Sequence, residues 1–159
     1  MSYAHSQVPD LKARYFEYKV LTPIHGRPTI DKILVIFKQL KRNAQRIPTS
    51  LGGGQLGYLA LVLTTIAYAT VPGAVAFVRP TDPGPFVLVP NPTPPATRAA
   101  PNPVPVPLTP EQIATQRAHY EERRRLYQEV QNAELVLRNT LLEAFEPDYL
   151  QPLRNSTTD

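Results

Sequence analysis

The sequence contains no cysteine and no tryptophan, and it has only three histidines in 159 residues. Without cysteine there is no disulfide, no thiolate ligand for zinc and no cysteine nucleophile. His5, His25 and His119 are far apart in the sequence and lack the paired spacing of a metal site. We therefore expect no metal, no cofactor, no small-molecule substrate and no catalytic residues, and hence no enzyme.

Glycine is also scarce, and three of the seven glycines are consecutive at 52–54. A glycine-rich loop that binds phosphate ends in Gly-Lys-Ser or Gly-Lys-Thr. Here the triplet is followed by Gln55 and Leu56, so we interpret it as a sharp turn and not as a nucleotide site.

A secretory signal is missing as well, because the N-terminus lacks a basic start, an apolar centre and a small-residue cleavage site. We expect a cytoplasmic protein. The longest stretch without charge runs from Ile47 to Val78. Its apolar part, Leu56 to Val71, has about 16 residues, fewer than the roughly 20 that span a bilayer. We favour a buried element in which 56–63 is extended or turning and Thr64 or Thr65 caps a short helix, with insertion of 56–78 into a membrane as the alternative.

Proline, by contrast, is abundant, and more than half of the 19 prolines lie in residues 80–107. Each proline fixes its own φ angle and keeps the preceding residue out of the helical region, so an extended, polyproline-like spacer is expected. The spacer predicts three parts: a basic N-terminal segment at 1–79, a linker at 80–108, and a helix with a polar tail at 109–159.

Charge is unevenly distributed over these parts. Residues 1–79 contain ten Lys and Arg side chains against three acids, a net charge of +7, whereas 109–159 has a net charge of −3. Such asymmetry favours binding of a polyanion by the basic part or electrostatic matching between chains.

The pattern predicts a mainly α-helical protein with two principal helices. Apolar residues from Ile30 to Ala44 follow helical spacing, with Thr29 as the N-cap and Pro48 beyond the end. Before this helix, 15–21 alternates loosely and is expected to be a short strand or an extended arm. The basic residues of the helix lie towards its C-terminal end and are candidates for contact with nucleic acid: Lys38, Lys41, Arg42 and Arg46.

The second helix is predicted from Thr109 to about Phe145. Thr109 suits the N-cap, Pro110 the first helical position and Gln112 the capping box. A near-heptad apolar stripe along it is the predicted self-association surface, with Gln116, Arg123 and Glu134 as polar interruptions. The residues of this stripe are Ile113, Tyr120, Tyr127, Val130, Leu137 and Leu141.

The order of several motifs resembles the Gag-like, capsid-type region of copia-type LTR retrotransposon polyproteins. The resemblance covers most of 20–159 and is carried by LTPIHGRPTIDKI, NAQRIPTSLGGGQLGYLALVL, AFVRPTDPGP and the segment from Tyr120 to the end. The proline-rich connection is longer than in the family, and no zinc knuckle or protease triplet follows, so a fragment or a relict copy is expected. The resemblance implies a structural protein that self-associates through helices and gathers RNA by a basic surface. A stand-alone nucleic-acid-binding module is the other alternative.

Overall fold

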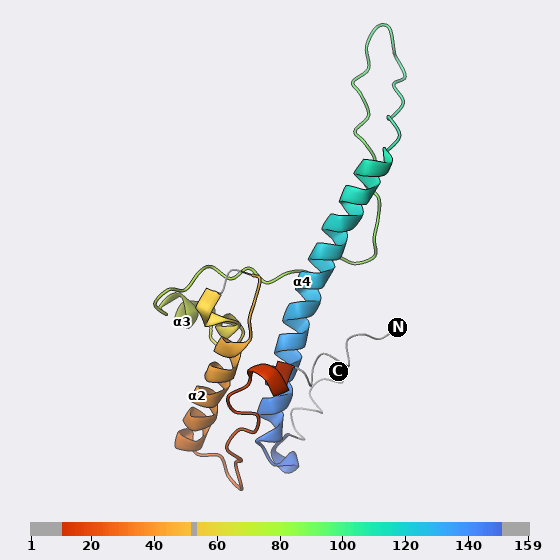
Figure 1. Ribbon diagram of the computed structural model, residues 1–159. Coiled ribbons are helices and arrows are strands. Elements are labelled where there is room, and N and C mark those ends of the chain that lie inside the picture. The colour runs from red at the N-terminus through yellow and green to blue at the C-terminus, as the bar shows by residue number, and fades with distance from the viewer. Residues whose placement is uncertain (1–10, 52–53, 151–159) are drawn as a thin grey trace. The chain divides into compact units, whose positions relative to one another are not determined.

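The protein is described by a computed structural model that covers residues 11–51 and 54–150 (Figure 1). Its helices are α2 (Ile30–Arg46), α3 (Thr65–Ala69) and α4 (Pro110–Glu143), with two short 3₁₀ turns, η1 (Gly54–Leu56) and η2 (Leu59–Leu61). Residues 11–15 and 147–150 are also helical. Within the described ranges there is no strand, and a single parallel bridge joins Ile24 to Phe145. The prediction of a mainly helical fold with a long C-terminal helix is confirmed.

Both principal helices begin where their capping residues predict. The Thr29 hydroxyl accepts a hydrogen bond from the Lys32 backbone, and the β-region backbone of Thr29 makes it the N-cap of α2. At α4 the capping box is complete: Gln112 N donates to Thr109 Oγ1 at 3.2 Å, and Thr109 N donates to Gln112 Oε1 at 2.9 Å. Local sequence therefore sets both starting points.

The uncharged stretch folds into short turns. Thr64 caps α3 through a 3.2 Å hydrogen bond from Ala67 N, as predicted, while the preceding residues form η1 and η2. In the part of the chain that is described, no helix is long and apolar enough to cross a membrane. Residues 52 and 53 of the glycine triplet lie outside the described residues.

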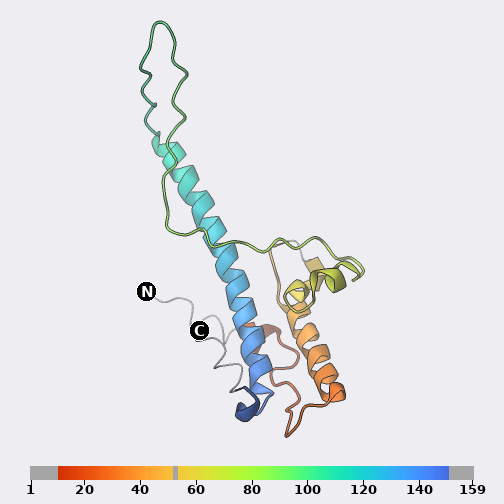
Figure 2. The same cartoon turned by 180° about the vertical axis from the view of Figure 1, so that it is seen from behind.

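The chain divides into two compact units, each considered by itself. The first comprises 1–79 and 129–159, and the second comprises 80–128. In the first unit, α2 and the C-terminal part of α4 lie side by side in both views (Figures 1 and 2). The core between and around them contains Phe16, Leu21, Ile24, Ile36, Leu40, Ala44, Ile47, Tyr58, Val130, Ala133, Val136, Leu137 and Ala144.

Of the short strand and the extended arm expected at 15–21, the strand is absent, since Tyr15 is helical and the residues after it have no regular structure. Two carboxamide side chains of α2 satisfy the backbone here instead. Asn43 accepts from Tyr18 N at 2.9 Å and donates to Tyr18 O at 2.8 Å. One turn earlier, Gln39 accepts from Thr22 N and donates to Thr22 Oγ1, both at 2.9 Å.

These two carboxamides differ in burial, so their removal is expected to lower the free energy of unfolding by different amounts. Asn43 is fully buried, whereas the bonds of Gln39 are exposed to water. Asn43→Ala leaves the part-buried N–H and C=O groups of Tyr18 without partners and is expected to lower the free energy of unfolding by about 2–3 kcal/mol. Gln39→Ala, the matched control, is expected to cost about 0.5–1 kcal/mol, because water replaces its bonds. Urea denaturation of both variants tests this, and equal losses would contradict it.

Gly57 is the point where the chain passes closest to the end of α2. Its φ of +50° lies in the left-handed region, and a Cβ there would come within 2.7 Å of three carbonyl oxygens, those of Ala44, Gln45 and Ile47. The next residue then donates its N–H to Ala44 O at 2.9 Å. Only glycine fits this conformation and this approach together.

Gly57→Ala is therefore expected to destabilise the fold by about 3 kcal/mol or more, since it adds a steric clash to left-handed strain. Gly73 is the matched control: its φ is +78°, but nothing lies within 4 Å of the position that a Cβ would occupy there. Gly73→Ala should cost about 1 kcal/mol. The comparison is read from thermal or urea unfolding, and a Gly57 variant as stable as the Gly73 variant would refute the packing argument.

Candidate interaction surface

The apolar face of α2 is only partly covered by its own chain. Ile36, Leu40 and Ala44 point into the core. The earlier apolar residues of the predicted face are exposed at spacings of three and four residues, with Ile30 at 77%, Ile33 at 46%, Leu34 at 58% and Phe37 at 37%. We call these four residues the α2 stripe. At 100° per residue the stripe is rotated from the buried face towards solvent.

An apolar groove of about 490 Å³ borders the stripe within the first unit. It lies between α2, η2 and the C-terminal part of α4, and its walls share Ile33 and Phe37 with the stripe. The remaining apolar lining is provided by Ile36, Leu40, Leu61, Val62, Leu137, Leu141 and Phe145. Stripe and groove form one continuous apolar surface, which is the usual character of a protein-binding site.

The predicted nucleic-acid residues lie on the same helix and differ in their surroundings. Arg46 pairs with Glu17 at 3.0 Å, and the Lys41 ammonium lies 4.9 Å from the centre of the Phe37 ring. Lys38 and Arg42 are exposed and have no charged partner among the described residues. With Arg46 they recur every four residues, so the three form a basic ridge on α2 beside the stripe.

The predicted self-association residues of α4 are divided between the two units. In the first unit, Val130 and Leu137 are buried and Leu141 is half-buried against the same core. In the second, Tyr120 and Ile113 are half-buried. Tyr127, also half-buried, belongs to the second unit. Self-association through this stripe stays a prediction, and within one chain its first-unit residues already have partners.

A polar residue that interrupts the predicted stripe has a defined role in the second unit. Gln116 accepts from Val89 N and donates to Val89 O, both at 2.8 Å. Phe86 packs with its ring centre 5.2 Å from that of Tyr120, whose hydroxyl donates to Gly84 O at 2.8 Å. These contacts hold the first part of the proline-rich segment along α4. The signal in the sequence was a glutamine at a position of the near-heptad stripe where the spacing predicts an apolar residue.

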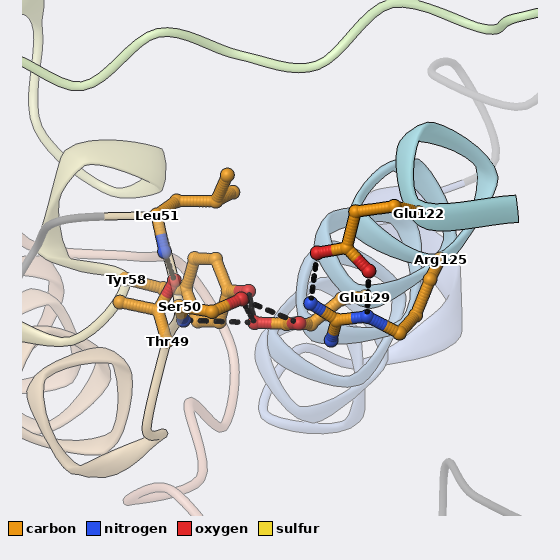
Figure 3. A network of polar contacts seen from close by, with 7 residues as sticks. All are labelled: Thr49, Ser50, Leu51, Tyr58, Glu122, Arg125 and Glu129. Atoms are coloured by element: carbon orange, nitrogen blue, oxygen red, sulfur yellow. Dashed lines mark hydrogen bonds and ion pairs between the residues drawn. The ribbon is translucent and has the colours of Figure 1, made fainter. Parts of the chain in front are cut away.

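The Glu129 carboxylate on α4 joins this helix to Ser50 and Tyr58 in the first unit (Figure 3). Glu129 accepts from the Tyr58 hydroxyl at 2.5 Å, from Ser50 N at 3.3 Å and from Ser50 Oγ at 3.1 Å. All these groups donate to the carboxylate, so the cluster holds α4 against the segment around Ser50. Figure 3 also shows Glu122 facing Arg125, whose hydrogen bond lowers the pKa of the exposed Glu122 carboxyl.

No group of three His, Asp or Glu side chains in the described ranges is arranged to hold a metal ion. A scan against protein-family models and searches of curated proteins and of solved structures found no match to the chain.

Proposed function

We propose that this protein is a non-catalytic, cytoplasmic structural protein of the Gag-like type that self-associates through helices. The observation that carries the proposal is the α2 stripe, four large apolar side chains left in water beside an apolar groove. Leaving such side chains exposed forfeits the free energy that their burial would contribute, so a partner surface is favoured. The motif order described above supports the Gag-like type.

The partner that best fits the stripe is a second copy of α2 running antiparallel. Asp31 and Lys38 are seven residues apart and therefore lie on the same side of the stripe. A two-fold axis near Leu34 brings Asp31 of each copy towards Lys38 of the other, and Ile30 towards Phe37. Such an interface is self-complementary in both charge and apolar contact.

Leu34→Glu tests this pairing, because it places a carboxylate at the centre of the proposed contact. Dimerisation of the full chain, followed by light scattering over a concentration series, is expected to weaken by at least about 100-fold. The matched control is Val35→Glu, because Val35 is an apolar residue of α2 that lies off the stripe and is also exposed, at 46%. A wild-type chain that is monomeric throughout, or equal effects of both variants, would count against the pairing.

Contact with RNA is the second function that a specific observation favours. Lys38 and Arg42 on the basic ridge are exposed and lack charged partners among the described residues, so they are available to phosphates. No aromatic platform for stacking bases adjoins them on α2 apart from Phe37, which lies under Lys41. The binding should therefore be electrostatic and independent of base sequence.

Lys38→Gln combined with Arg42→Gln is expected to weaken binding of single-stranded RNA and to reduce the slope of log K against log salt by about 1.4. Arg123→Gln combined with Arg124→Gln makes the same change of net charge on exposed residues of α4 and serves as the control. Fluorescence anisotropy at several salt concentrations measures both. Equal slopes for the two variants would move the RNA contact away from α2.

A further inference from the structure

Many contacts among the described residues join the part of the chain before residue 97 to the part after residue 100. In the first unit the joining contacts include Lys12 to Glu143 at 3.0 Å and Ile24 N to Ala144 O at 2.8 Å. In the second they include the pair of bonds between Val89 and Gln116. We call 11–96 and 101–150 the N-terminal and C-terminal halves. Covalently, residues 97–100 are the only connection between them.

The connection is a tight reversal with few contacts of its own. Thr97 N donates to Ala100 O, and Ala100 N to Thr97 O, both at 3.1 Å, and all four residues are exposed. The flanking stretches 90–95 and 101–107 are rich in proline and therefore stiff and extended. Straightening the reversal breaks these exposed bonds and lets the stiff flanks continue in one direction. The bonds of Asn91 on one flank to Val106, Pro107 and Gln112 on the other side also break, and they re-form only between copies.

We propose that two copies exchange halves at this reversal, so that the N-terminal half of each packs on α4 of the other. All contacts between the halves then re-form between chains, which is why such exchange has a low cost. Opposite net charges of the basic and acidic parts favour their encounter in trans. The exchange rests on the proposed function, since it names a second copy as partner, but it uses the core contacts and not the α2 stripe.

The exchange also gives the predicted α4 residues a role between chains. Val130 and Leu137 pack against the N-terminal half in the first unit, and Tyr120 does so against Phe86 in the second. In an exchanged pair these same burials become contacts with the other copy. The side chains that bind the extended segment, such as Gln116, then hold the partner's Val89.

Cross-linking of full-length chains tests the exchange, using the ion pair between Arg79 and Glu134. One chain carries Arg79→Cys and the other Glu134→Cys, both with Leu34→Glu so that pairing through the stripe is removed. The two are unfolded together, refolded and treated with a short bismaleimide. We expect a covalent dimer several-fold above that from a control in which Ile66→Cys, exposed on α3, replaces Arg79→Cys. A chain with both cysteines shows that the linker spans the site.

The reversal itself supplies the second measurement, by light scattering in the same Leu34→Glu background. Ala100→Pro removes the donor to Thr97 and drives Ala99 towards extended backbone, so the dimer fraction should rise several-fold. Inserting Gly-Gly-Ser after Arg98 relaxes the reversal and should lower it. An Ala100→Pro chain that is monomeric at all concentrations overturns the exchange, whereas loss of wild-type association by Leu34→Glu alone would still support the proposed α2 pairing.

Discussion

In the part of the chain that is described there is no strand, and side-chain amides of helices bind backbone that lies outside the helices. Asn43 satisfies Tyr18, and Gln116 satisfies Val89, each with one accepted and one donated hydrogen bond. A carboxamide can do this because it carries a donor and an acceptor at the spacing of a peptide group. Without the Asn43 bonds, the part-buried N–H and C=O groups of Tyr18 would be unpaired against α2, which is costly. In the first unit, Asn43 thus takes the place of a strand partner for the segment before α2 and ties that segment to the helix beside the core.

Local signals in the sequence were enough to predict both helix starts. Thr29, Thr109 and Gln112 act through bonds to residues three positions away, so their effect can be read without knowledge of the fold. The rotation of α2 was not predictable in this way. Which of its apolar residues are buried depends on where Tyr58 and α4 pack against it, and these come from distant parts of the sequence.

The near-heptad stripe of α4 also depends on distant parts of the sequence. Heptad spacing treats Gln116 as a defect, yet this residue binds the segment that covers its part of the helix. Glu134, another polar interruption, pairs with Arg79. Both positions face chain that precedes the reversal at residues 97–100. Spacing correctly located the covered face of α4, but it could not tell an apolar partner from an extended backbone or an arginine.

Two separate surfaces on one chain have a consequence for the kind of assembly it would form. The proposed exchange at residues 97–100 would join two copies into a closed pair, because the N-terminal half of each copy then packs on α4 of the other and no half is left over. That pair still carries two α2 stripes, one from each N-terminal half, and neither stripe is used by the exchange. Antiparallel contact of each stripe with another pair adds a second two-fold interface, and two different two-fold interfaces on one particle generate an open chain unless their axes meet. A structural protein needs such extension, and the α2 stripe would decide whether it occurs.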